Sequence, residues 1–435
     1  MKQMRVLWVI VMLSMLLIER DERVGWARPN AAATSGQTGV FMPPVTLSNS
    51  SYTTTNPSIF IHNNTVDVMW EQGTATIGNK DLFFTESADN GRVWSNPIAF
   101  YTSVKNSLRP DMALDMSGNV QVIWDEWTGS IRLTHHKPLK SGTAVTIEPS
   151  VNASASAHDI VVSSNNRIHV VFPGNKPGVE KTPFFPYYAS RDVSGTTWLT
   201  ATAVYTASIG TGSQYPSVTI DSQDNLHLVW QEQEAAADGR IFYAKGLNNS
   251  GVITWQTAVP IVTDPAITNA ARPAIAIDEN DTLHLVWENY ISIGEQYLYY
   301  AHSTGDTAVQ PGATTWSSPQ PIVNGRVKAN NSLPTYVSPK ISLFNNTVYI
   351  LWIDSTQDIG GQEDVFLAYS DDLGVTWSSP VNVSRSANIQ SLSPKMDVDT
   401  AGTIHIVWQE KAGGRYMVQY TQSAYGIFLP MVTRP

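Results

Sequence analysis

Residues 215–230 read YPSVTIDSQDNLHLVW, and residues 272–287 repeat the pattern as RPAIAIDENDTLHLVW. Each segment has a proline near its start, a short apolar run, a polar turn, and an alternating run that ends in tryptophan. Such self-similarity along a chain is typical of repeat architectures, in which each unit is one supersecondary element.

The same pattern occurs seven times in the chain. The first runs begin NPSIFI at 56, RPDMALD at 109, AHDIVVS at 157, YPSVTID at 215, RPAIAID at 272, SPKISLF at 338 and SPKMDVD at 393. The second runs end at Trp70, Trp124, Phe172, Trp230, Trp287, Trp352 and Trp408. A third run such as DLFFTES or QYLYYAH follows in most copies, and then a fourth that resembles WSSPVNV. Four short antiparallel strands per copy predict a propeller blade.

The predicted fold class is therefore all-β, a seven-bladed β-propeller of four-stranded antiparallel blades, with six blades as the alternative count. A closed ring packs each blade against two neighbours, which explains strands that are apolar on both faces. The seventh copy lacks a fourth strand, and residues 44–48 resemble one. We expect this N-terminal strand to close the ring and remove its open edges. The propeller domain is predicted to span residues 40–423.

Composition excludes several functions. The chain has a formal net charge of −10, which makes a nucleic-acid partner improbable. It contains no cysteine, so disulfides, thiolate metal sites and cysteine nucleophiles are excluded. No cofactor is predicted, and the expected oligomeric state is a monomer.

The N-terminal residues resemble an export signal. Lys2 and Arg5 precede an apolar run from Val6 to Ile18, and Ala31–Ala33 is the cleavage candidate. We expect residues 1–33 to be a signal peptide and the protein to be secreted, with no stable membrane insertion after cleavage. An uncleaved anchor, which would place the protein at the cell surface, is the alternative. Residues 424–435 form a short apolar tail.

Two turns match the pattern Ser-x-Asp-x-Gly-x-(Thr/Ser)-Trp. One runs from Ser87 to Trp94, with Val93 at the hydroxyl position, and the other runs from Ser370 to Trp377 as a full match. A stretched version lies at 190–198. On these motifs the chain resembles sialidases and related Asp-box (BNR-repeat) propellers. The resemblance implies that these turns are structural and that the binding site lies on the opposite face. Catalytic sialidases have six blades, an arginine triad, a Tyr/Glu pair and an Asp acid, whereas this chain has seven repeats and no Arg-Ile-Pro string.

The opposite face carries the start of each first strand and the exit of each second strand. The residues at the strand starts are Asn56, Arg109, Ala157, Tyr215, Arg272, Ser338 and Ser393, and those at the exits are Glu71, Asp125, Glu126, Gly174, Glu232, Glu288, Asp354 and Glu410. We predict that Arg109, Arg272, Glu288, Glu71 and Asp125 bind ligand. Arg109 and Arg272, three blades apart, could together bind one carboxylate of a ligand. The alternative is that each pairs with a neighbouring Glu or Asp of the protein at the rim.

Candidate catalytic residues are Tyr215 as nucleophile, Glu232 as its base, and Asp111 or Asp159 as acid. Arg240 and Arg415 are weaker candidates for a third cation. Similar loops in seven blades also place acidic residues at one rim without any chemistry, so a structural role remains open.

The histidines at one repeated strand position, His169, His227, His284 and His405, predict a repeated packing or hydrogen-bonding role, and no metal site is predicted. The proline-rich segment 173–186 is expected to project over the mouth.

Two functions remain. One is a non-catalytic propeller that recognises carbohydrate or another extracellular ligand at the channel mouth. The other is an exo-sialidase-type glycoside hydrolase that acts on acidic glycans. Whether the protein is an enzyme therefore stays open at this stage.

Overall fold

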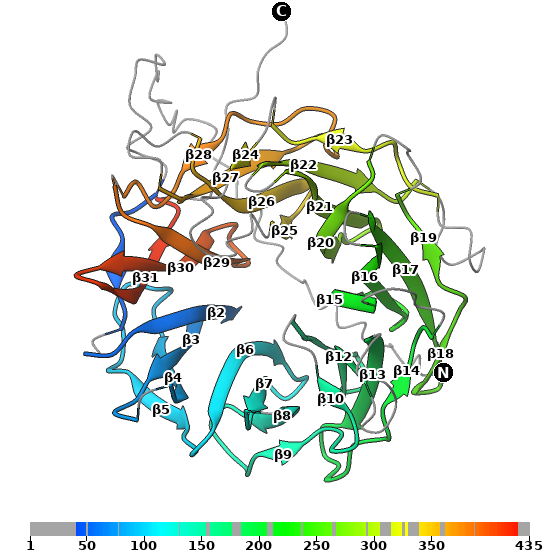
Figure 1. Ribbon diagram of the computed structural model, residues 1–435, viewed down its shortest axis with the longest axis horizontal. Helices are drawn as coiled ribbons and strands as arrows, with labels where there is room; N and C mark the ends of the chain where they lie inside the picture. Colours follow the sequence, from blue (N-terminus) through cyan, green and yellow to red (C-terminus); the bar gives the residue numbers. More distant parts are fainter. Residues whose placement is uncertain are drawn as a thin grey trace, which may run out of the picture. The chain divides into compact units, whose positions relative to one another are not determined.

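The computed structural model describes residues 41–424 apart from short segments, and these residues form a ring of antiparallel sheets (Figure 1). The segments not described are 49–50, 77, 130, 154–156, 176–183, 207–211, 236–237, 263–266, 293–294, 305–314, 324–326, 329–338, 357–361 and 387. The protein is an all-β, seven-bladed propeller, so the predicted fold and blade count are confirmed and the six-blade alternative is wrong. Within the described part no helix could cross a bilayer. The predicted signal peptide, most of the 173–186 segment and nearly all of the tail lie outside the described residues.

The first four blades follow each other along the chain. Blade 1 consists of β2 (Thr54–His62), β3 (Thr65–Gly73), β4 (Lys80–Ser87) and β5 (Ile98–Tyr101). Blade 2 consists of β6 (Asn106–Leu114), β7 (Val120–Trp127), β8 (Arg132–Pro138) and β9 (Val145–Thr146). Blade 3 consists of β10 (Asn152–Ala153), β11 (Asp159–Val162), β12 (Arg167–Asn175), β13 (Phe185–Asp192) and β14 (Thr202–Ala203). Blade 4 consists of β15 (Gly212–Ile220), β16 (Leu226–Ala235), β17 (Asp238–Asn249), β18 (Val252–Trp255) and β19 (Val259–Pro260).

The last three blades complete the ring. Blade 5 consists of β20 (Ala270–Ile277), β21 (Leu283–Ser292), β22 (Glu295–His302), β23 (Gln320–Pro321) and β24 (Val327–Lys328). Blade 6 consists of β25 (Lys340–Phe344), β26 (Thr347–Asp354), β27 (Asp364–Ser370) and β28 (Val381–Asn382). Blade 7 consists of β29 (Ser391–Val398), β30 (Ile404–Ala412), β31 (Arg415–Gln422) and β1 (Val45–Thr46).

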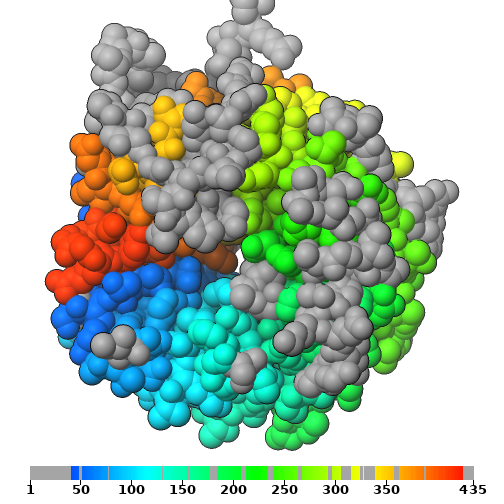
Figure 2. Space-filling view, viewed as in Figure 1, coloured from blue at the N-terminus to red at the C-terminus, as the bar shows by residue number. Residues whose placement is uncertain are grey.

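The N-terminal strand closes the ring as predicted. In blade 7, β1 pairs antiparallel with β31, with Val45 opposite Tyr420, and Phe41 bridges to Ser423. Figures 1 and 2 show the N-terminal (blue) and C-terminal (red) blades side by side. Pairing of this kind leaves the third strand of the last blade without an open edge.

The core lies between neighbouring blades. The repeated tryptophans at the ends of the second runs are buried, and Trp70, for example, packs in one cluster with Val407 and Val418 of blade 7. Another cluster joins Val286 of blade 5 to Trp352 of blade 6. The second strands therefore supply the side chains that hold adjacent sheets together.

The aspartate turns lie at the end of the blade away from the second-strand exits. In blade 6, Asp354 pairs with Asp364 at one end of the β26–β27 ladder, and Val348 pairs with Ser370 at the other. Asp372 accepts hydrogen bonds from the backbone N–H (2.8 Å) and the hydroxyl (2.6 Å) of Thr376. Asp89 accepts the same backbone hydrogen bond from Val93 in blade 1 (2.8 Å). These bonds are the turn-stabilising contacts that the residue types predict.

Candidate functional site

Five innermost strands carry a β-bulge where they begin at the rim. The residue before the proline has a left-handed backbone conformation, with φ between 47° and 52°. These residues are Asn56, Arg109, Tyr215, Arg272 and Ser393. A bulge bends a strand and re-aims its side chains, and it often occurs beside functional sites. Five of the strand starts selected from the sequence therefore have an unusual, left-handed backbone conformation.

Three of the bulged residues connect their blade to the preceding one. Their backbone N–H groups donate to the side chain that follows the buried tryptophan of the preceding blade. The bonds run from Arg109 to Glu71 (2.8 Å), from Arg272 to Gln231 (3.3 Å) and from Asn56 to Gln409 (2.8 Å). Glu71, a predicted ligand residue, thus serves as an acceptor between blades 1 and 2.

Asp125 is the centre of a cationic cluster at the rim of blade 2. Its buried carboxylate accepts a hydrogen bond from Arg109 Nη2 (2.5 Å) and another from Thr134 Oγ1 (3.2 Å). His158 Nδ1 lies 3.3 Å from it, and Arg132 Nη1 lies 3.9 Å from it. Burial alone would raise the pKa of Asp125, but His158 and Arg109 outweigh burial and hold this pKa well below its usual range. Asp125 is therefore ionised.

Arg132 and Trp127 are cross-strand neighbours at the same rim. The guanidinium carbon lies 5.9 Å from the centre of the Trp127 ring, and the indole is 40% exposed. Burial and the nearby Arg109 lower the pKa of Arg132. Arg132 Nη1 has no hydrogen-bond partner in the described part of the chain. A second guanidinium beside one carboxylate leaves this cluster with excess positive charge, which favours an added anion.

A second carboxylate borders the cluster. Glu126 lies 3.2 Å from Lys105 Nζ and 3.3 Å from His135 Nε2, and it accepts a hydrogen bond from the Tyr101 hydroxyl (3.5 Å). Burial and the Glu126 charge raise the pKa of Tyr101. Glu126 therefore balances Lys105 and does not cancel the charge of Arg132.

Arg272 is held within blade 5 and against blade 4. Its guanidinium pairs with the buried Glu288 and lies over the Tyr215 ring, 4.8 Å from the ring centre. Burial would lower the pKa of Arg272, but Glu288 and Tyr215 outweigh burial and raise it. Arg109 and Arg272 thus each pair with a carboxylate of their own blade, Asp125 and Glu288.

The candidate catalytic residues have separate surroundings. Tyr215 contacts Arg272, and among the described residues it makes no hydrogen bond to Glu232 or Asp111. The buried Glu232 carboxylate accepts hydrogen bonds from Ser213 Oγ (2.7 Å) and Trp230 Nε1 (3.1 Å). Asp111 lies one residue past the bulge proline and bonds to the N–H of Met112 (3.0 Å). These contacts do not join the three residues into one constellation.

Charged residues at one repeated position of the innermost strands, Asp111, Asp159, Lys340 and Lys395, form a further group. Burial and the neighbouring Asp111 raise the pKa of Asp159 to about 6. Burial and Lys395 lower the pKa of Lys340 to about 7. The two acids come from adjacent blades 2 and 3, and the two lysines come from blades 6 and 7. Their charges interact across the centre of the ring.

The repeated histidines have the predicted hydrogen-bonding role. In four blades the histidine Nδ1 bonds to a tyrosine hydroxyl of the third strand at 2.7 or 2.8 Å. The pairs are His169–Tyr188, His227–Tyr243, His284–Tyr300 and His405–Tyr420. No group of three or more His, Asp or Glu that could hold a metal occurs within the described residues.

Solved structures with this fold include polysaccharide lyases and a sialidase. A PL25 ulvan lyase bound to -[GlcA(1-4)Rha3S]- matches with a TM-score of 0.58 and 10% identity, covering 85% of this chain and 93% of that chain. Polysaccharide lyase Uly1 matches with a TM-score of 0.53 and 12% identity, covering 91% and 94%. The NanB sialidase of Streptococcus pneumoniae matches with a TM-score of 0.47 and 10% identity, covering 88% and 70%. The sequence matches no family model and no curated protein.

The expected resemblance is thus confirmed for the architecture, and at these identities the likeness concerns the fold alone. Arg132, Trp127 and His158 were not among the residues predicted to bind ligand. Arg132 is the first residue of a third strand, as Arg415 is, and Arg240 lies near the start of β17, so the repeat alignment contained a signal for Arg132. Trp127 had no such signal, because its exposure depends on how β7 ends.

Proposed function

We propose that this protein is a carbohydrate-recognition propeller that binds an acidic glycan at the rim of blade 2 without cleaving it. The observation that carries the proposal is the convergence of Arg109, Arg132 and His158 on one carboxylate, Asp125, beside the exposed Trp127 indole. Guanidinium groups bind carboxylates and sulfates in bidentate fashion, and an indole face suits the apolar face of a sugar ring.

Local charge supports an anionic ligand. The rim of blades 1 and 2 carries Lys80, Lys105, Arg109 and Arg132 against Glu71, Asp125 and Glu126. Lys80 and Lys105 are paired with Glu71 and Glu126, whereas Arg109 and Arg132 share the single carboxylate of Asp125, in a chain whose formal net charge is −10. The ulvan lyase propeller was solved with a glycan that contains GlcA and Rha3S. An acidic extracellular glycan fits both observations, and it agrees with the export that the N-terminal sequence predicts.

The binding test uses a glycan array that contains uronate, sulfated, sialylated and neutral oligosaccharides, followed by calorimetry on the strongest acidic hit. Arg132→Gln removes the guanidinium whose Nη1 has no hydrogen-bond partner among the described residues, and Trp127→Ala removes the exposed ring. We expect each to weaken binding about tenfold, or about 1.4 kcal/mol, and high salt to weaken wild-type binding. Arg92→Gln, on an exposed turn at the other end of blade 1, is the matched control and should leave affinity within about twofold. Equal affinity of all variants, or no acidic hit, would contradict the proposal.

The hydrolase alternative is tested separately. Tyr215 lies under Arg272, and Glu232 is engaged by Ser213 and Trp230, so we expect no release of fluorophore from an aryl sialoside. The same protein should produce no ultraviolet absorbance of unsaturated uronate from acidic polysaccharides. Turnover that disappears in Tyr215→Phe would replace the recognition role with catalysis at the mouth.

A further inference from the structure

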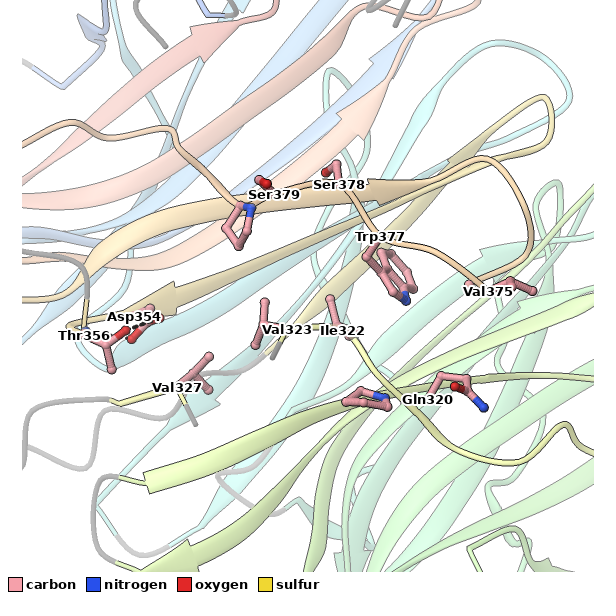
Figure 3. A pocket seen from close by; sticks show the side chains of 13 residues that line it. Gln320, Ile322, Val323, Val327, Asp354, Thr356, Val375, Trp377, Ser378 and Ser379 are labelled. Atoms are coloured by element: carbon pink, nitrogen blue, oxygen red, sulfur yellow. Dashed lines mark hydrogen bonds between the residues drawn. The ribbon is translucent and has the colours of Figure 1, made fainter. Parts of the chain in front are cut away.

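A cleft of about 550 Å³ opens between blades 5 and 6, away from the blade 2 rim (Figure 3). One wall is the outer edge of blade 5, from Gln320 to Val323 together with Val327. The opposite wall is the aspartate turn of blade 6 and the residues after it, from Gly374 to Pro380. Asp354 and Thr356 contribute from the exit of β26. Pockets of about 300–1,000 Å³ are typical of small-ligand sites.

The outer strands that border the cleft are short. Both β23 and β28 contain only two residues, and the cleft lies between the chain segments around them. In Figure 3, Asp354 and Thr356 lie at one end, Val375 and Gln320 at the other, and Trp377 between them. The cleft therefore runs along the blades from the second-strand exit toward the aspartate turn, as a ligand with several linked units requires.

Trp377 is held in a fixed position. It packs edge-on against Tyr300 of blade 5, with the ring centroids 5.3 Å apart and the planes at 76°. Tyr300 is fully buried, and Gly374 lies directly against it. A rigid, half-buried indole in the middle of a cleft is a suitable platform for a sugar ring.

The remaining described lining mixes apolar and polar residues and is nearly uncharged. Ser378, Ser379, Thr356 and Gln320 present hydroxyl and amide groups. Asp354 is the single ionisable residue in the described part of the lining, and its carboxylate accepts hydrogen bonds from the N–H and the hydroxyl of Thr356, both at 2.8 Å. Among the described residues, the lining contains no lysine, arginine or histidine. An acidic sugar would find no counter-charge in it, whereas the hydroxyl groups of a neutral sugar match these donors and acceptors.

We propose that the cleft between blades 5 and 6 binds a neutral glycan chain, as a second carbohydrate site with a chemistry different from that of the blade 2 rim. The proposal does not rest on the acidic-glycan site, because none of its residues is shared with that rim. Two sites on one propeller would allow a single molecule to engage a mixed polysaccharide at two points, which increases avidity without any new contact.

The test measures binding of the full mature chain to cellohexaose, xylohexaose and mannohexaose by calorimetry. Val375→Arg places a long charged side chain at the edge of the cleft, and it copies the residue that the same turn carries in blade 1, Arg92, so folding should be preserved. Gln320→Ala removes one polar contact from the exposed opposite wall. Val93→Arg adds the same charge to the blade 1 turn and serves as the matched control.

We expect at least one of these oligosaccharides to bind wild-type protein and the Val93→Arg control equally. Val375→Arg should weaken this binding at least fivefold and Gln320→Ala at least twofold. Arg132→Gln should leave neutral-glycan binding unchanged while it weakens acidic-glycan binding, so the two proposals fail separately. No binding of any neutral oligosaccharide, or wild-type affinity in both cleft variants, would overturn the proposal; capture of a peptide in place of a sugar would overturn it as well.

Discussion

Gly374 illustrates how a single residue sets the distance between two blades. Its φ of 81° lies in the left-handed region, and a Cβ at this position would lie 2.1 Å from Cε1 of Tyr300. Gly91 has the same relation to Tyr420 in the contact between blades 1 and 7. The glycine of the aspartate turn is therefore required both by its backbone conformation and by the ring that lies against it.

Gly374→Ala should destabilise the protein far more than Gly118→Ala. Both glycines have a φ of 81°, but a Cβ at position 118 would meet no atom within 4 Å. We expect Gly118→Ala to cost about 1–2 kcal/mol from backbone conformation alone, and Gly374→Ala about 2 kcal/mol more from the clash. Urea denaturation followed by tryptophan fluorescence measures both values. Equal losses in the two variants would show that Tyr300 moves aside without cost.

At the scale of the element, Glu71 connects β3 to strands of two blades. It accepts hydrogen bonds from Arg109 N (2.8 Å), Asn56 Nδ2 (2.7 Å), Thr55 Oγ1 (2.9 Å) and Lys80 Nζ (2.6 Å). The equivalent position is glutamine in blades 4 and 7, where it accepts the same backbone N–H of the next blade. A side-chain oxygen is therefore the common requirement, and the negative charge is particular to blade 1.

Glu71→Gln should be tolerated and Glu71→Leu should not. Glutamine keeps an acceptor for the Arg109 N–H, and we expect a loss of about 1 kcal/mol in the free energy of unfolding. Leucine leaves several part-buried donors without this acceptor and the Lys80 ammonium without its counter-charge, so we expect a loss of about 3–4 kcal/mol. Chemical denaturation of the two variants gives the comparison. A Leu variant as stable as the Gln variant would mean that the rim bulge does not depend on this acceptor.

At the scale of the whole molecule, the histidine–tyrosine pairs make the ring sensitive to acid. Burial, with a smaller contribution from Arg167, lowers the pKa of His169 to about 4. Burial also lowers the pKa of His227, His284 and His405. Because these values lie below the unfolded value of about 6.5, the unfolded chain takes up protons first as the pH falls. The stabilisation is complete above pH about 6.5 and is lost progressively toward pH 4.

Replacement of one histidine should reduce this acid sensitivity measurably. Blade 2 naturally has Gln121 at the histidine position, bonded to His136 at the tyrosine position (2.8 Å), so His169→Gln is compatible with the fold. Between pH 7.5 and pH 5.0 we expect the variant to lose about 2 kcal/mol less stability than the wild type. Urea denaturation at the two pH values, with Gly118→Ala as a control that carries no titratable change, gives the comparison. Identical pH dependence in His169→Gln and wild type would contradict this role of His169.

The number of blades, their strands, the closing N-terminal strand, the aspartate turns and the histidine role could all be predicted from the sequence. Each depends on local patterns repeated along the chain: the buried tryptophan, the alternation of apolar residues and the residue types of one turn. Each repeat shows the same strand pattern independently. The last repeat lacks a fourth strand, and this gap predicted that the N-terminal strand closes the ring.

Only the tertiary structure decided which rim residues meet. The left-handed bulge at Arg109, the approach of Arg132 to Asp125, and the Gly374–Tyr300 contact all depend on backbone geometry at blade edges or on packing between blades. The cleft beside Trp377 likewise depends on how far two outer strands separate. Sequence periodicity specifies each sheet, but side chains from different strands and blades come together through the closure of the ring, and no local pattern encodes those distances.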